Sequence, residues 1–153
     1  MIEKGDLVNS IYNFPVDMTF FTTADLLEIG DIPLTSPSEK PKRIEVLKYY
    51  RRVVDYYDLP IKYQERVVSV KGEEDNFRVE SLDKFEQSQE YRAKRVIIAT
   101  GYYDNPNKLN IAGEDLGKVS HYYSECHSYF KKKVAVIGGN NSAAETALDL
   151  YRN

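Results

Sequence analysis

The sequence predicts an α/β fold, and three features carry that prediction. Two short apolar runs, Val96–Ala99 and Val134–Ile137, each lead into a turn that contains glycine. Continuously apolar runs of this kind are typical of strands buried on both faces of a parallel sheet. Between residues 61 and 95, apolar and polar residues alternate instead, which predicts a meander of half-buried strands.

The first part of the chain predicts a strand end, a long loop and a helix. Ile2 has the character of the tail of a buried strand, followed by a turn. Residues 7–31 are irregular and rich in Thr, Asn, Pro and aromatic residues, which predicts a long loop with short pieces of structure. Long loops in compact domains are usually functional. From Ile44 to Tyr57 the apolar residues follow helical spacing, which predicts a helix.

The second part predicts the meander, a connector and a final strand–turn–helix unit. Alternating segments at residues 61–72, 76–83 and 90–100 predict three strands, the last ending in the first apolar run. Residues 101–132 are rich in turn signals and are expected to connect two domains. After the second apolar run, a helix is expected to begin at Asn141 or Ser142.

The composition limits the classes of protein to which the chain can belong. Of 153 residues, 42% are hydrophobic and 29% are charged, which is typical of a folded globular protein. The net charge of −3 argues against a nucleic-acid partner, because such partners usually require a basic surface. No apolar run approaches the roughly 20 residues of a membrane span. A single cysteine fits a reducing cytoplasm, where disulfides are rare.

The closing segment has the pattern of a phosphate-binding turn. Such a turn needs a buried strand, a tight bend and a helix whose N-terminal amides point at the anion. The sequence GGNNSA, Gly138–Ala143, follows the pattern G-x-G-x-x-G/A except that Asn140 replaces the middle glycine. Asparagine tolerates a positive φ better than most residues, so the turn can survive. Alone this motif is a weak signal, and an ordinary strand–glycine–helix connection is the alternative.

Two other groups of residues strengthen the nucleotide-binding interpretation. Ala99-Thr100-Gly101 stands at the carboxyl end of the first apolar run, where ligands bind in open α/β sheets. Small residues there let a bulky ligand approach the backbone closely. Glu3 follows a predicted strand, as does the acid that binds ribose hydroxyls in such folds. The alternatives are a small-residue turn after a core strand and an ordinary surface glutamate.

Cys126, with His121 and His127 nearby in the sequence, does not predict a reactive or metal site. A reactive thiol needs a lowered pKa and a positioned partner, and one Cys beside one His in a loop is more often neither. A structural zinc site needs four ligands at tighter spacing. We therefore expect no metal site and no catalytic residue in this segment.

Together the motifs resemble flavoproteins with two dinucleotide-binding domains, such as thioredoxin reductases and flavin monooxygenases. The segments VNSIYNFPVDMTFFTTADLLEIGD, IIATGYYDNPN, VSHYYSECHSYF and VAVIGGNNSAAETALDL are similar to the YpdA-type bacillithiol-disulfide reductases. In that family a strand, a glycine-rich turn with the reactive cysteine, and a helix precede the position of Ile2. Further residues follow the position of Asn153. The resemblance therefore implies a middle segment of a longer enzyme.

The resemblance implies cofactor-binding roles position by position. Glu3 and Lys4 correspond to the ribose and adenosine side of FAD, and Val68 to a backbone contact with adenine. Thr19 and Phe20 belong to the loop, Thr19–Thr23, that faces the flavin ring. The residues that pass the FAD phosphate and ribose are Ala99, Thr100 and Gly101. Those that cradle the NADPH pyrophosphate are Gly138, Gly139, Asn140, Asn141, Ser142 and Ala143.

The implied fold class is a Rossmann-like FAD/NAD(P)-binding flavoprotein with two dinucleotide-binding domains and a β-meander insert, here incomplete. Residues 1–115 are expected to form a partial FAD-binding domain, with the meander at about residues 61–95. Residues 116–153 are expected to form the connector and the first βα unit of the NAD(P)-binding domain.

The implied activity is FAD-dependent, NADPH-linked reduction of a small-molecule thiol disulfide, such as bacillithiol disulfide, in the cytoplasm. The resemblance implies neither a nucleic-acid partner nor a membrane partner, and it leaves a homo-oligomer of the full-length form open. One alternative is a catalytically inactive nucleotide-binding fragment, which we expect of the isolated chain because it lacks the first phosphate-binding turn. The other is a flavin monooxygenase-like enzyme. The connector of those enzymes carries a fingerprint that the segment GKVSHYYSE of this chain matches only in part.

Overall fold

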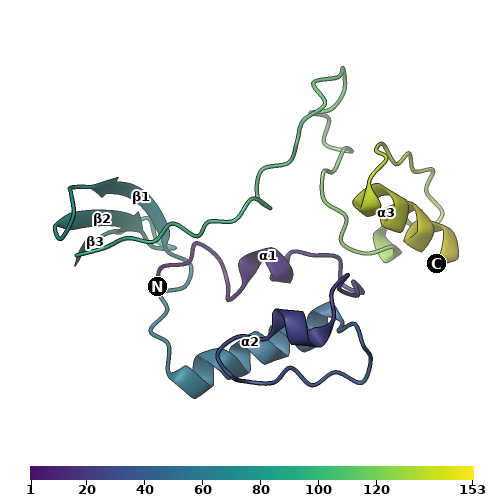
Figure 1. Cartoon of the computed structure of the whole chain (residues 1–153). Helices are drawn as coiled ribbons and strands as arrows, with labels where there is room; N and C mark the ends of the chain where they lie inside the picture. Colours follow the sequence, from purple (N-terminus) through teal and green to yellow (C-terminus); the bar gives the residue numbers. More distant parts are fainter.

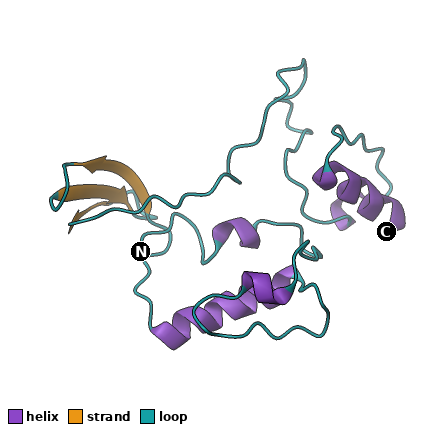
Figure 2. Cartoon of the chain, in the orientation of Figure 1, coloured by secondary structure: helices purple, strands orange, loops and turns teal.

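The computed structural model describes residues 1–153, the whole chain. Figures 1 and 2 show three small units joined by extended segments: a β-meander, a helical unit built on α2, and a unit around α3 at the C-terminus. The elements in order are α1 Asn9–Tyr12, η1 Ala24–Leu27, α2 Arg43–Tyr57, β1 Arg66–Lys71, β2 Phe77–Leu82, β3 Ser88–Ala93, η2 His127–Tyr129 and α3 Asn141–Arg152.

The main hydrophobic core lies between α2 and the loop that precedes it. The predicted helix at residues 44–57 is confirmed, and it buries Val46, Tyr49 and Val53, which share one helical face. The Glu45 carboxylate accepts a hydrogen bond of 2.7 Å from the Lys42 amide at the start of the helix. Phe20, Ile32 and Leu34 complete the core from the long loop. That loop contains only α1 and η1, as the sequence predicts.

The β-meander forms an antiparallel sheet in the order β1-β2-β3. Val79 and Ser81, which share one face of β2, are buried. The Ser81 hydroxyl donates a hydrogen bond of 2.5 Å to the buried carboxylate of Glu65. Since Glu65 precedes β1 directly, this bond ties the start of the meander to its central strand.

The N-terminus joins the meander to the rest of the chain. Ile2 forms a parallel bridge with Lys62, and the Glu3 amide donates to the Lys62 carbonyl at 2.8 Å. The Glu65 amide returns a bond of 3.0 Å to the Glu3 carbonyl. The predicted strand character of Ile2 is therefore present as this short pairing.

The two apolar runs predicted as buried strands are extended but unpaired, so that part of the prediction is wrong for this chain. Ile97, Ile98 and Ile137 are 91%, 77% and 70% exposed. No backbone hydrogen bond joins either run to a neighbouring strand. A doubly buried strand needs a partner on each edge, and the one sheet of the chain is the meander. β3 accordingly ends at Ala93 and does not continue into residues 96–99.

The C-terminal unit consists of η2 and α3 and buries little. The helix begins at Asn141, one of the two predicted positions, and no residue of α3 is buried. The Tyr123 hydroxyl donates to the Asp149 carboxylate and attaches the helix to the connector. None of the helices has both the length and the apolar character required to cross a membrane.

Candidate functional site

Glu3 and Lys4 lie at the turn that follows the first strand pairing. The Glu3 carboxylate accepts a hydrogen bond of 3.0 Å from the Gly5 amide, so its orientation is fixed by its own turn. Gly5 itself packs on Asn9 so closely that a Cβ built there would lie 2.3 Å from the Asn9 side chain. A rigid turn therefore presents the acid that the sequence predicts as a ribose ligand.

An ion pair brings two distant motifs together at this turn. The Lys4 ammonium contacts the Asp104 carboxylate, and Asp104 closely follows Ala99-Thr100-Gly101. Gly101 has a φ of +66°, and a Cβ built there would lie 3.9 Å from the Ser10 hydroxyl of α1. The structure thus places the Glu3-Lys4 motif and the segment after residue 99 around the same end of α1.

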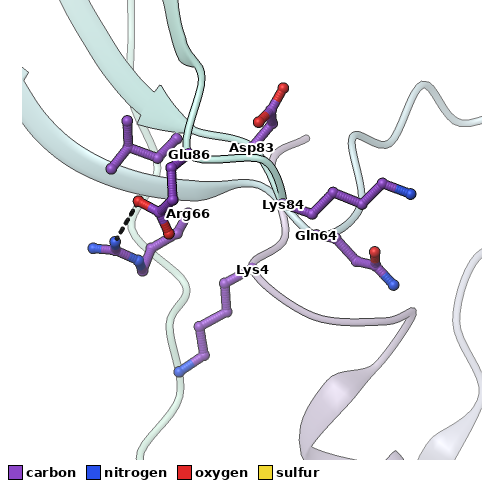
Figure 3. A pocket seen from close by; sticks show the side chains of 7 residues that line it. Lys4, Gln64, Arg66, Asp83, Lys84 and Glu86 are labelled. Atoms are coloured by element: carbon purple, nitrogen blue, oxygen red, sulfur yellow. Dashed lines mark ion pairs between the residues drawn. The ribbon is translucent and has the colours of Figure 1, made fainter.

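A polar cleft of about 350 Å³ opens beside Lys4, and we name it the Lys4 cleft. Figure 3 shows its lining side chains, which come from the N-terminus, from the start of β1 and from the turn after β2. The polar ones are Lys4, Gln64, Arg66, Asp83, Lys84 and Glu86, and Leu82 at the end of β2 completes the lining. Arg66 lies 4.0 Å from Glu86, while Lys84 faces the ring of Phe85. The cleft therefore combines three cationic side chains with two carboxylates and an amide, and hydrogen-bonding groups of this kind suit a sugar or a nucleoside.

Val68 lies on β1 at a break in the strand pairing. Val67 pairs with Ser81 and Ser69 pairs with Glu80, so Val68 is left without a partner in the ladder. A bulge of this kind leaves the backbone groups of the extra residue free for other contacts. The geometry fits the predicted backbone contact of Val68 with an adenine, which stays a prediction.

The loop predicted to face the flavin ring is partly buried in the hydrophobic core. Thr19 bridges to Lys42, and Phe20 is only 9% exposed within the hydrophobic core. The Phe20 side chain therefore packs inside the protein. Thr22, two residues later, has a buried hydroxyl with no hydrogen-bond partner, the only such side-chain atom in the chain. A buried polar group normally has a partner, so Thr22 fits a bound group that would supply one.

The glycine turn that is predicted to bind phosphate lies at the start of α3. Gly138 has a φ of +146°, and a Cβ built on it would lie 3.0 Å from Cβ of Ala143. Asn140 has a φ of −98°, so the tolerance for positive φ that the sequence analysis invoked is not needed there. The tight bend is made by Gly138, and Asn140 stands just before the helix.

The N-terminus of α3 has the chemistry of an anion site. Asn140 makes no side-chain capping bond, and its carbonyl is used by the amides of Ala143 and Ala144. The amides of Asn141 and Ser142 make no backbone hydrogen bond. Free amides at the positive end of a helix attract phosphate. The turn is thus a second candidate site, separate from the Lys4 cleft.

The connector contains a polar pair that the sequence analysis did not identify. The Glu114 carboxylate lies 2.9 Å from Nε2 of His121 and accepts bonds from the amides of Leu109 and Asn110. The hydrogen bond with His121, followed by that from Leu109, lowers the pKa of Glu114 to about 2. His121 therefore contacts Glu114 and holds the connector turn together.

Three residues of these sites, Asp104, Arg66 and Lys84, were not predicted from the sequence, whereas Thr22 lies within the predicted loop. The position of Asp104 just after Ala99-Thr100-Gly101 was the one available signal for these three, because pairing of the meander strands brings Arg66 and Lys84 to the cleft.

Comparison with known proteins places this geometry in a family. The whole chain, residues 1–153, matches the pyridine nucleotide-disulphide oxidoreductase family. It is 45% identical over 153 residues to bacilliredoxin reductase Bdr of Bacillus subtilis, covering all of this chain and 46% of that protein.

Two solved structures have the same fold. Bacillithiol disulfide reductase Bdr (YpdA) of Bacillus cereus superposes with a TM-score of 0.95 at 45% identity, over 99% of this chain and 47% of that one. The Staphylococcus aureus protein of the same name superposes with a TM-score of 0.92 at 42% identity, over 99% of this chain and 45% of that one. The chain spans about half the length of these relatives. With its Rossmann-like FAD/NAD(P)-binding fold, the chain belongs to the pyridine nucleotide-disulphide oxidoreductase family.

Proposed function

We propose that this chain forms part of an FAD-dependent, NADPH-linked reductase of a low-molecular-weight thiol disulfide. The observation that carries the proposal is the Lys4–Asp104 contact, which gathers two motifs from distant parts of the sequence at one turn. A cofactor as long as FAD needs such convergence of segments. The relatives named above are disulfide reductases by name, and that supports the reaction class.

The residues of the chain would bind and orient the cofactors. Glu3 would accept hydrogen bonds from ribose hydroxyls, and the Lys4 cleft with Val68 would hold the adenosine end of FAD. The orphan hydroxyl of Thr22 would bind the flavin side. Gly138 and the free amides of Asn141 and Ser142 would receive the NADPH pyrophosphate. Ala143 would keep the helix close to the turn.

Bound NADPH and FAD would supply the redox chemistry, a two-electron reduction, while the residues of this chain would hold and orient them. The disulfide would accept two electrons, its S–S bond would break, and two protons would complete a pair of thiols. The names of the relatives point to bacillithiol disulfide or to a bacilliredoxin, and we propose the small molecule, acted on in the cytoplasm.

A chimera tests the activity. Residues 1–153 replace the matching part of the Bacillus subtilis relative, and flavin content is measured first by absorbance near ~450 nm. We expect NADPH consumption that depends on bacillithiol disulfide and yields a pair of thiols for each NADPH. Consumption that needs oxygen and forms no thiol would favour a monooxygenase. Consumption only with an oxidised bacilliredoxin would overturn the small-molecule assignment.

The isolated chain tests the cofactor site directly. We expect FAD to bind weakly and FMN, which lacks the adenosine, to bind more weakly still, with the colour lost on desalting. Glu3→Gln should weaken FAD binding, while Glu74→Gln, in the exposed turn before β2, should not. Equal affinity for FAD and FMN would contradict the assignment of the Lys4 cleft to adenosine.

A further inference from the structure

A second cavity, of about 570 Å³, lies between the α2 unit and the connector. We name it the tyrosine pocket, since its walls include Tyr12, Phe14, Tyr103, Tyr122 and Tyr123, with Arg43 at one side. The volume falls in the range of small-molecule sites. None of the residues assigned to a cofactor lines it, but Asp104, the partner of Lys4, does.

The ring walls are held in place before any ligand arrives. The Tyr103 hydroxyl donates to the Asn13 carbonyl at 2.9 Å, and the Tyr122 hydroxyl donates to the Tyr103 carbonyl. The rings of Phe14 and Tyr103 meet edge to face at 5.0 Å. Burial, with Tyr122 nearby, raises the pKa of the Tyr103 hydroxyl. Because the hydroxyls are used in these bonds, the rings offer mainly their faces.

Arg43 shapes the pocket rather than supplying a free charge. Its Nε donates to the Ile11 carbonyl at 3.0 Å, and its guanidinium also donates to the Tyr12 carbonyl and faces the Tyr12 ring. Asp104, which also borders the pocket, is paired with Lys4. The site therefore has aromatic faces with a few polar groups at its edge.

The pocket is next to the loop predicted to face the flavin. The Phe14 ring lies 6.2 Å from the Phe20 ring, and Phe20 belongs to the loop that carries the orphan hydroxyl of Thr22. On its other side, Tyr123 contacts Asp149, near the C-terminal end of α3. That end is about 12 Å along the helix from the phosphate-binding turn, at 1.5 Å per residue. This position favours the disulfide over the dinucleotide as the occupant.

We propose that the tyrosine pocket binds the non-reacting body of the disulfide substrate, through a ring that has an apolar face and a polar edge. This proposal rests on the proposed function. Aromatic walls select a ring because flat contact with an aromatic face buries apolar area, whereas Asn13 and Asp104 at the edge can bind hydroxyl groups. A sugar and an aromatic group share this chemistry.

Binding of an uncharged ring probe to the 153-residue chain tests the pocket without any flavin. The probe is 4-nitrophenyl β-D-glucopyranoside, and the signal is tyrosine fluorescence, because the chain has 13 Tyr and no Trp. We expect Tyr122→Ala to weaken binding roughly 2- to 12-fold, the effect of losing one aromatic contact. Tyr122→Phe keeps the ring but loses the hydrogen bond to the Tyr103 carbonyl, so its affinity should lie between those of the parent chain and Tyr122→Ala. Tyr151→Ala, which removes an 88% exposed ring on α3, is the matched control.

Two smaller probes show which ring of 4-nitrophenyl β-D-glucopyranoside the pocket binds. Methyl β-D-glucopyranoside carries only the sugar ring, and 4-nitroanisole carries only the aromatic ring. Displacement is then measured in a Cys126→Ser background, which prevents thiol exchange. Bacillithiol disulfide should displace the probe, and the ringless 2-hydroxyethyl disulfide should not.

Several results would overturn the proposal: no probe binding, equal binding by Tyr122→Ala and the parent chain, or equal loss in Tyr151→Ala. Binding without displacement by bacillithiol disulfide would overturn the substrate assignment. Because none of these readouts uses flavin, they are independent of the chimera's disulfide reduction, and either proposal can fail alone.

Discussion

The glycine turn at the start of α3 allows a matched pair of substitutions. Gly138 has a φ of +146°, and an added Cβ would lie 3.0 Å from Cβ of Ala143, tighter than ordinary van der Waals contact. Gly139 is its neighbour, and an added Cβ there would meet nothing within 4 Å. Gly138→Ala should therefore disturb the turn, and Gly139→Ala should leave it nearly unchanged.

The size of the effect follows from the backbone. Holding a residue other than glycine in a sparsely populated φ region costs about 1–3 kcal/mol. If the turn must keep its shape to bind phosphate, that cost appears as a roughly 5- to 150-fold loss of NADPH affinity in Gly138→Ala. The close contact with Ala143 adds to it, because the helix must shift to make room.

The assay is an NMR titration of the 153-residue chain with NADPH, following the amides of Asn141 and Ser142, which make no backbone hydrogen bond. We expect these amides to shift most in the parent chain and in Gly139→Ala. The reasoning is refuted if Gly138→Ala binds as tightly as the parent chain, or if both variants lose the same affinity. A parent chain whose amides do not respond to NADPH refutes the placement of the pyrophosphate itself.

Three further predictions concern other parts of the molecule. Ser81→Ala leaves the buried Glu65 carboxylate without the hydroxyl that donates to it at 2.5 Å, so the free energy of unfolding in urea should fall by about 1–3 kcal/mol. Ser88→Ala, at an exposed position of β3, should change it hardly at all. The pKa of Glu114 is lowered from 4.5 to about 2. Its contribution to the stability of the connector is therefore present above about pH 4.5 and is lost as the pH falls through about 2. An NMR titration of Glu114 should show the lowered pKa, and an ordinary pKa would contradict this contact. The double substitution Ile97→Lys and Ile98→Lys should reduce self-association of the isolated chain, measured by sedimentation, because both side chains are exposed. Ile44→Lys, at an exposed position of α2, serves as the control. An equal effect of the control would argue against a specific role of residues 96–99.

Local patterns in the sequence were sufficient for the elements that stabilise themselves through near neighbours. The α2 helix buries Val46, Tyr49 and Val53 with helical spacing, and the meander closes through turns between consecutive strands. The bend at Gly138 and the start of α3 are likewise local, because they depend on the φ of one glycine and on free amides in the next turn. Each of these features is determined within a few residues of where it appears.

Tertiary structure decided what depends on distant partners. The runs Val96–Ala99 and Val134–Ile137 have the composition of buried strands, but a strand needs neighbours for its backbone groups, and within this chain none lies beside them. Phe20 has the same aromatic character as its exposed neighbour Phe21, yet only the folded loop directs one ring into the core. The contact of Lys4 with Asp104 and the walls of the tyrosine pocket join residues that the sequence separates widely. Such contacts are set by how the units pack, and no local pattern encodes them.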